Sequence, residues 1–302
     1  MNKVTLRVPA TSANCGPGYD CFGVALNLYN EVTYELTDSG KMELDVQGEG
    51  AGTMAPAGNV AFSSFFRVWN KITNARRTGL KISQINRIPM SRGLGSSSAA
   101  IVGGVYAANI LGEGKFNKAE LLRYANALEG HPDNVAPALY GNFNISFFEP
   151  QGPRSFVLQP AKPIKFVACI PELKIATEQA RQAIPFKINH RDAVMNLSRS
   201  ALLVAALCSG QYEYLATALL DKLHQPYREH LIPGLREAFY RAKLAGAYNA
   251  IISGAGSTIM AYAAPESDLE AIGNAMVSAL KNKGVESRFA IFDMDTQGVM
   301  EI

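Results

Sequence analysis

Residues that bind metals or form cross-links are scarce in this sequence. Its 302 residues include only four cysteines and four histidines. No two of the cysteines form a C-x-x-C pair, which argues against a zinc ribbon or a thioredoxin-like motif. Four histidines leave little material for a histidine-rich metal site. The simplest expectation is a protein with free thiols in a reducing cytoplasm.

A strong charge bias and long apolar runs are also missing. Lysine and arginine number 29 and aspartate and glutamate 26, so the net charge of +3 is too small to predict a nucleic-acid or membrane partner. No apolar run reaches the ~18 residues of a membrane span. The first residues lead straight into an alternating pattern, so no signal peptide is expected. Hydrophobic residues make up 48% of the chain, which is enough for a sizeable core.

Length and hydrophobic periodicity indicate two α+β domains. At roughly 150 residues per domain, the chain is long enough for about two. The first pattern combines a strand at 4–8, a loop at 9–20, a helix at 59–70 and a small, apolar helix at 99–111. A second pattern begins after residue 160 and ends with a helix at 266–283 and a last strand at 287–292. We predict one domain over residues 1–155 and another over 156–302.

The most informative motif is the glycine- and serine-rich segment at 93–100, GLGSSSAA. Glycines let the backbone approach a ligand closely, and the N–H groups and dipole of the following helix favour an anion. The segment is neither a Walker A loop, nor a Rossmann fingerprint, nor a G-x-S-x-G elbow. The alternative is a serine-rich helix cap, but the length of the motif and the apolar helix behind it favour a phosphate cradle.

Three further motifs concentrate polar residues in short segments. The first, PATSANCGPGYD at 9–20, offers Asn14 and Asp20 to an amine or a hydroxyl, unless it is an ordinary turn. The second, EGHPDN at 129–134, brings two carboxylates, an imidazole and an amide together, which suits Mg²⁺ and a polar substrate. Taken singly, these residues could equally be solvated or turn residues. The third, SGAGST at 253–258, reads by itself as a tight hairpin.

In this order and spacing, the four motifs resemble those of the GHMP kinase family, which includes galactokinase, homoserine kinase and mevalonate kinase. The motif at 9–20 is similar to PATSANLGPGFD of the homoserine kinase branch, with Cys15 replacing leucine and Tyr19 replacing phenylalanine. The segment at 129–138 is similar to EGHPDNVAPA of the same branch. The resemblance implies a two-domain fold with an N-terminal domain like domain 2 of ribosomal protein S5 and a ferredoxin-like C-terminal domain.

The resemblance also implies roles for individual residues. ATP would be bound by Asn59, Val60, Pro89, Arg92, Gly93, Leu94, Gly95, Ser96, Ser97, Ser98 and Ala99. Magnesium would be held by Ser97, Ser98 and Glu129. The substrate would be bound by Asn14, Asp20, His131, Thr177, Arg181 and Arg228. The catalytic residues would be Glu129, Asp133 and Asn134. The alternative for the two arginines is a solvated helix face.

The reaction implied by the resemblance is ATP-dependent phosphorylation of the hydroxyl of L-homoserine, a step toward threonine. Asp20 and Asp133 would pair with the ammonium group, and Arg181 and Arg228 with the carboxylate. We expect direct transfer without a strong base, because phosphoryl transfer depends mainly on positioning and charge neutralisation. Two alternatives stay open: another small alcohol such as L-threonine or mevalonate, and a silent ligand sensor. The family also implies a homodimer.

Overall fold

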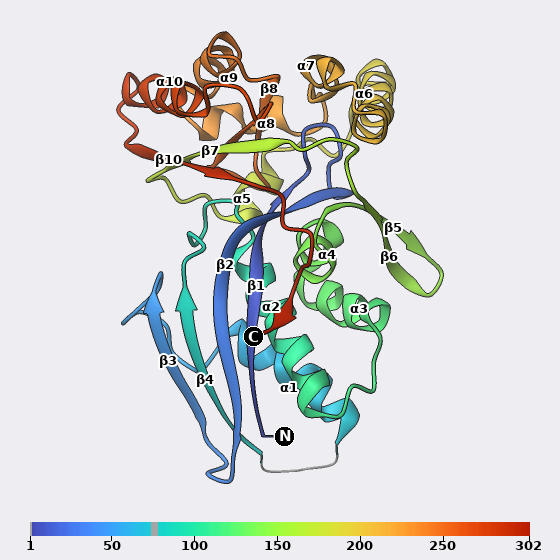
Figure 1. The fold of residues 1–302 in the computed structure, drawn as a ribbon, viewed down its shortest axis with the longest axis vertical. Helices are drawn as coiled ribbons and strands as arrows, with labels where there is room; N and C mark the ends of the chain where they lie inside the picture. Colours follow the sequence, from blue (N-terminus) through green and yellow to red (C-terminus); the bar gives the residue numbers. More distant parts are fainter. Residues whose placement is uncertain (1, 74–77) are drawn as a thin grey trace.

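The computed structural model describes residues 2–73 and 78–302, and it contains two β-sheets with helices packed against each (Figure 1). Strands of the first sheet are β1 (Lys3–Ala13), β2 (Phe22–Thr37), β3 (Met42–Gly48), β4 (Gly79–Asn86), β5 (Phe143–Glu149), β6 (Gly152–Leu158) and β11 (Met300–Glu301). They run in the order β11-β1-β2-β4-β3, and the β5–β6 hairpin pairs with the beginning of β2. Only β3 and β4 pair in parallel within this sheet.

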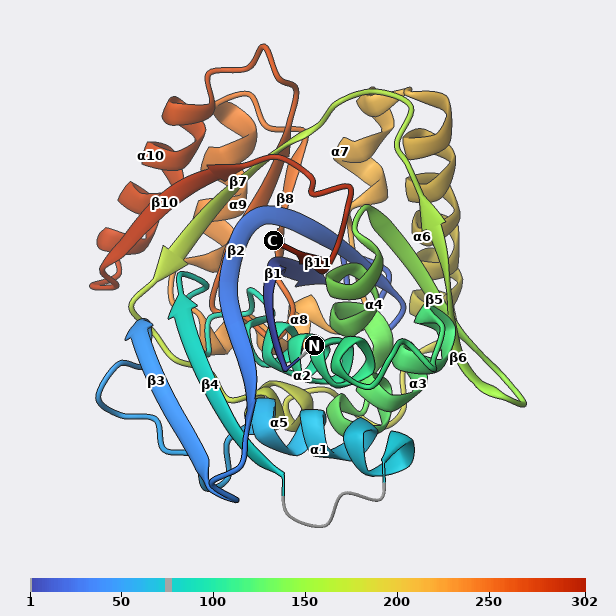
Figure 2. The same ribbon diagram turned by 60° about the horizontal axis from the view of Figure 1, so that its bottom comes forward.

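Four helices gather on one side of the first sheet (Figure 2). They are α1 (Val60–Ile72), α2 (Ser96–Leu111), α3 (Lys118–Glu129) and α4 (Pro132–Tyr140). Helix α2 consists mostly of small or apolar residues on all its faces, and it is buried between α1 and β1. Asn117 begins α3 with a capping box, in which its side chain accepts from Glu120 N and the Glu120 carboxylate accepts from Asn117 N.

The second sheet has the strand order of a ferredoxin-like domain. Its strands are β7 (Lys165–Pro171), β8 (Asn249–Ile252), β9 (Ile259–Ala263) and β10 (Ser287–Phe292). All pairs are antiparallel in the order β10-β7-β9-β8, which is the 4-1-3-2 order of a βαββαβ unit. Helices α9 (Leu235–Leu244) and α10 (Leu269–Lys281) pack against it.

The connection from β7 to β8 carries the remaining helices. These are α5 (Thr177–Gln182), α6 (His190–Ser209), α7 (Leu215–Ala218) and α8 (Gln225–Arg228), with short 3-10 turns at Tyr212–Tyr214 and Glu229–Leu231. Arg181 on α5 contacts Asp20, and Arg228 on α8 lies over the Tyr19 ring, so this long crossover brings side chains of the second half toward the motifs of the first.

The second sheet is buried on both faces. On one face, Phe166 and Tyr262 join the same apolar cluster as Leu6 and Val8 of β1. On the other face, Ile252 packs in a cluster with residues of α9 and α10. The two sheets with their helices agree with the predicted α+β, two-domain architecture, and the first of these two clusters contains residues of both halves.

The predicted domain boundary does not coincide with a boundary between the two sheets. The boundary at 155/156 lies inside β6, a strand of the first sheet. After β10 the chain returns to the first sheet, where Arg7 pairs with Met300 in β11. The division into 1–155 and 156–302 stays a prediction about folding units.

Several elements differ from the sequence analysis in extent. The segment at 9–20 was expected as a loop, but β1 runs on to Ala13 because a register shift at Pro9/Ala10 keeps its end paired with β2. Strands β6 and β11 and helix α4 were not expected from the sequence. Helix α4 was hidden because Pro132 looks like a break, although proline is well suited to a first helical position. Strand β11 follows the element expected to be last.

Candidate active site

The glycine- and serine-rich segment forms a tight turn into α2. Gly93 and Gly95 have φ of 77° and 72°, in the left-handed region. A Cβ at Gly93 would lie 2.1 Å from Ser253 O, and one at Gly95 would lie 1.9 Å from Thr11 Oγ1, so neither position has room for a side chain. Gly95 is the N-cap of α2, which leaves the first N–H groups of the helix without intrahelical acceptors. This end of the helix can bind an anion.

Glu129, the last residue of α3, faces the first turn of α2. Ser98 Oγ donates a hydrogen bond of 2.6 Å to Glu129 Oε1, and Ser97 Oγ donates one of 3.3 Å to Glu129 Oε2. One carboxylate and two hydroxyls are oxygen ligands of the kind that Mg²⁺ accepts when phosphate oxygens and water complete its shell. No group of three His, Cys, Asp or Glu residues suited to a metal occurs in the described parts of the chain.

The beginning of α4 supplies a second polar cluster. Asp133 is almost fully buried and lies 2.7 Å from His131 Nδ1. Burial lowers the pKa of His131, but the hydrogen bond and negative charge of Asp133, together with Glu129, outweigh it and raise the pKa above its usual value. Asn134 Oδ1 accepts a hydrogen bond of 2.8 Å from Thr11 Oγ1 on β1. The cluster therefore holds a buried carboxylate next to the helix end described above.

An ion pair joins the two halves of the molecule across the site. Arg181 on α5 makes two hydrogen bonds to Asp20, of 2.7 and 3.0 Å, and a third of 3.0 Å to Tyr19 Oη. Asn14 supports this loop, because its Oδ1 accepts from Asp20 N and its Nδ2 donates to Gly254 O. Both side chains of the ion pair are about one-third exposed, so ligands can reach it.

Arg228 on α8 is the deepest cation of the site. Its side chain is buried, and none of the described carboxylates lies within ion-pair distance of it. Its guanidinium donates to Ala180 O at 2.9 Å and to Gly254 O at 3.0 Å. Burial lowers the pKa of Arg228, although a guanidinium stays charged at neutral pH. A negatively charged ligand would provide the counterion that the fold does not.

These groups line one cavity of about 180 Å³ between the two halves of the chain. A neighbouring cavity of about 230 Å³ shares Ser91, Ser96 and Ser97 with it and is also lined by Val60 and Asn86. The serine-rich helix end thus lies between two spaces, one lined by charged side chains and the other by amide and apolar side chains.

Comparison with known proteins identifies the family. The family models described as GHMP kinases N terminal domain and GHMP kinases C terminal match residues 59–142 and 203–282. The homoserine kinase of Carboxydothermus hydrogenoformans is 40% identical over 300 residues, covering 99% of this chain and 97% of the relative. The homoserine kinase of Clostridium beijerinckii is 41% identical over 297 residues, covering 98% and 97%. The chain belongs to the GHMP kinase family.

A solved structure extends this likeness to the fold. The crystal structure of homoserine kinase from Cytophaga hutchinsonii has a TM-score of 0.91 and 28% identity, covering 100% of this chain and 98% of that one. Mevalonate kinase of L. major, at 17% identity and a TM-score of 0.74, shares the fold. Both the sequence and the architecture of this GHMP kinase are therefore shared along nearly the whole chain.

Most of the residues proposed from sequence meet at the charged cavity of about 180 Å³. Its lining includes Asn14, Asp20, Pro89, Gly93, Leu94, Gly95, Ser96, Ser97, Ser98, Glu129, His131, Asp133, Asn134, Thr177, Arg181 and Arg228. Four proposed nucleotide residues lie elsewhere. Val60 lines the neighbouring cavity, and Asn59 uses its side chain to cap α1. Arg92 donates to Pro171 O and Met90 O, while Ala99 is buried inside α2.

Other lining residues were not proposed from sequence. In the charged cavity they are Tyr19, Ser91, Ile175, Ala176, Gly254, Ala255 and Gly256. The hairpin at 253–258 was noted as a motif but assigned no role, since only the fold shows that it packs on Gly93 and Asn14. In the neighbouring cavity they include Asn30, Gln84 and Asn86, buried amides that alternate along β2 and β4 without any local motif.

Proposed function

We propose that this GHMP kinase transfers the γ-phosphoryl group of ATP to the hydroxyl of L-homoserine, giving ADP and O-phospho-L-homoserine. The observation that carries the proposal is that one cavity is lined by two different sets of groups. The anion-binding end of α2 and Glu129 lie on one side, and the charged pair Asp20–Arg181 with Arg228 lies on the other. Homoserine carries an ammonium, a carboxylate and a hydroxyl, which this second set of charges can bind.

ATP would extend from the neighbouring cavity to the end of α2. The amide-lined space next to Val60 and Asn86 suits a nucleoside, since amides can hydrogen-bond to base or ribose edges. The N–H groups of the first turn of α2 would bind the phosphates. Mg²⁺ would be held by Glu129 with Ser97 and Ser98, and it would neutralise charge on the phosphates.

Homoserine would be oriented by charges from both halves. Arg228 and Arg181 would bind its carboxylate, while Asp20 and Asp133 would pair with its ammonium. Asn134 would lie near the hydroxyl, with Thr11 fixing its amide. Held this way, the hydroxyl would attack in line with the γ-phosphorus as the bond to ADP breaks, and its proton would pass to solvent. No dedicated strong base is needed because the transition state is loose.

The test is Mg-dependent ADP release with L-homoserine, L-threonine, L-serine and mevalonate as acceptors. Turnover with homoserine alone supports the proposal. Turnover only with another alcohol refutes homoserine as substrate but keeps the nucleotide assignments. ATP binding without turnover of any acceptor favours a silent sensor. If the protein turns over homoserine, Arg228→Ala should raise the homoserine KM and leave the ATP KM unchanged.

We also propose that the protein is a homodimer in the cytoplasm. The four cysteines are free, which fits a reducing compartment. No helix within residues 2–73 and 78–302 is long and apolar enough to span a bilayer. Leu197 on α6 and Phe148 in the β5–β6 hairpin are 72% and 64% exposed, so they are accessible to a second copy of the chain. A molecular mass by light scattering of twice 32.6 kDa for the wild type and of 32.6 kDa for Leu197→Asp would support the dimer. A monomeric wild type would refute it.

A further inference from the structure

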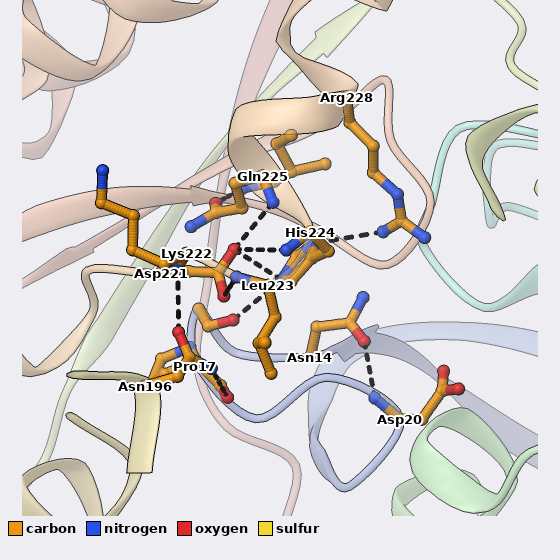
Figure 3. A network of polar contacts seen from close by, with 12 residues as sticks. Asn14, Pro17, Asp20, Asn196, Asp221, Lys222, Leu223, His224, Gln225 and Arg228 are labelled. Atoms are coloured by element: carbon orange, nitrogen blue, oxygen red, sulfur yellow. Dashed lines mark hydrogen bonds and ion pairs between the residues drawn. The ribbon is translucent and has the colours of Figure 1, made fainter. Parts of the chain in front are cut away.

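His224 lies behind the charged cavity, fully buried between the loop after β1 and helix α8. Its Nε2 is 2.8 Å from Gly16 O, and its Nδ1 is 3.2 Å from Arg228 Nη1 (Figure 3). The Tyr19 ring lies 5.3 Å from the imidazole, centroid to centroid, and also covers the Arg228 guanidinium. The imidazole thus connects the loop that carries Asp20 to the arginine that lines the cavity.

The partners of His224 determine where its proton lies, and they include Asp221 Oδ2, 3.5 Å from Nε2, beside Gly16 O and Arg228. A carbonyl oxygen only accepts hydrogen bonds and a guanidinium only donates them. Nε2 must therefore carry the hydrogen that Gly16 O accepts, and Nδ1 must present a lone pair to Arg228. Burial lowers the pKa of His224, and the Arg228 charge acts in the same direction, while Asp221, the Gly16 carbonyl and Asp20 oppose them. The net shift favours this neutral form.

Asp221 fixes the backbone on which His224 stands. Its buried carboxylate accepts hydrogen bonds from Leu223 N, His224 N and Gln225 N, at 2.8, 3.0 and 2.7 Å. Gln225 Oε1 then accepts from Ile252 N at the end of β8, at 2.7 Å. With the backbone held on both sides, the imidazole has a fixed position relative to the second sheet.

The contacts of Arg228 account for three of its five N–H groups. Nε donates to Ala180 O, and Nη1 donates both to Gly254 O and to His224 Nδ1. The two N–H groups of Nη2 remain for the cavity that Arg228 lines. Without the His224 contact, one Nη1 hydrogen would lose its acceptor and the guanidinium could turn about its last side-chain bonds.

We propose that His224 is a positioning residue, whose neutral Nδ1 holds Arg228 so that Nη2 faces the carboxylate of the substrate. The inference rests on the proposed function, because it takes an amino acid as the ligand of Arg228. It predicts that losing the Nδ1 acceptor weakens binding of the carboxylate and leaves the nucleotide end of the cavity unchanged.

Two substitutions separate the two sides of the imidazole. An asparagine amide oxygen occupies roughly the place of Nδ1, and a glutamine amide nitrogen that of Nε2. His224→Gln therefore keeps a donor for Gly16 O and loses the acceptor for Arg228, whereas His224→Asn does the reverse. We expect His224→Gln to raise the homoserine KM about tenfold, in line with loss of a hydrogen bond that supports a charged group, with kcat and the ATP KM changed less than about twofold. His224→Asn should change the homoserine KM by less than about threefold.

A ligand without the carboxylate gives the decisive control. 3-Aminopropan-1-ol has the ammonium and hydroxyl of homoserine only, so its inhibition constant should be the same in His224→Gln and wild type. The positioning role is overturned if both substitutions raise the homoserine KM equally. It is also overturned if His224→Gln weakens binding of 3-aminopropan-1-ol as much as binding of homoserine. If His224→Gln does not fold, a tenfold higher homoserine KM in a folded His224→Asn variant overturns it as well. A wild type that forms no ADP with homoserine overturns the proposed function itself and, with it, this inference.

Discussion

Replacing Asp20 by asparagine separates binding from stability at the ion pair that spans the site. Asp20→Asn removes the carboxylate that accepts two hydrogen bonds from Arg181. An amide of the same shape retains one acceptor for the guanidinium. It has no negative charge for the ammonium group of an amino acid.

The expected magnitudes differ for the two properties. The two side chains are 35% and 36% exposed, and ion pairs with this access to water contribute about 0.2–1 kcal/mol to stability. For a chain of this size that is a decrease in Tm of about 2 °C or less. A hydrogen bond between charged groups contributes about 1.5–3 kcal/mol. Its loss in the complex corresponds to a rise of roughly 10- to 150-fold in the homoserine KM.

The assay is ADP release with homoserine varied at saturating Mg-ATP, and then with ATP varied at saturating homoserine, beside thermal unfolding. Asp38→Asn is the matched control, because Asp38 is an exposed turn residue and the substitution changes the net charge equally. A homoserine KM within about threefold of wild type would refute the ammonium contact at Asp20. Equal increases in the homoserine and ATP KM would point instead to a general disturbance of the cavity.

Three further predictions concern other parts of the site. Glu129→Gln should lower kcat by about 100-fold and raise the Mg²⁺ concentration needed for half-maximal rate, because it removes the carboxylate proposed to bind the metal; an unchanged Mg²⁺ titration would contradict this. Tyr19→Phe should raise the homoserine KM by about two- to fivefold, because Arg181 loses one hydrogen bond, and steady-state kinetics would detect it. The raised pKa of His131 means that its charged pair with Asp133 stabilises the fold fully below the unfolded pKa of about 6.5 and that this contribution is lost as the pH rises through the folded value. Urea midpoints of wild type and His131→Asn should therefore converge as the pH is raised from 5.5 to 8.5, and a constant difference would contradict the assignment.

Local signals in the sequence predicted the phosphate-binding helix well. Glycines that allow positive φ and a run of small, apolar residues are local properties of the sequence, so this pattern alone indicated the turn and the helix. The neighbours of the turn are distant in sequence and came only from the fold; they are Thr11, Glu129 and Ser253. Asn117 and Glu120 form a complete cap within four residues. The elements that were missed depend on distant partners: β11 is two residues long and exists because Met300 pairs with Arg7.

The charged side of the site shows the same limit. The resemblance indicated that Asp20 and Arg181 belong to it, but not that they pair with each other across 161 residues. His224 carried no local signal, since its role depends on Gly16 and Arg228, which the fold brings to opposite sides of its ring. A nucleotide role for Asn59 followed from the resemblance, whereas its amide is engaged in capping α1. Contacts within one turn of helix are readable from sequence, and contacts between the halves require the fold.

The Asp20–Arg181 pair holds, before any ligand arrives, the same two opposite charges that a zwitterion brings with it. A zwitterion entering between them would replace this one ion pair with two, one at each of its own charges, so the summed charge of the pair and its ligand stays zero. Ligands with a single charge would leave one member of the pair uncompensated. This pair therefore exerts little long-range attraction on a zwitterionic acceptor, whereas the end of α2 would attract the net negative charge of ATP. Ionic strength should accordingly slow capture of the nucleotide while leaving capture of the amino acid almost unaffected.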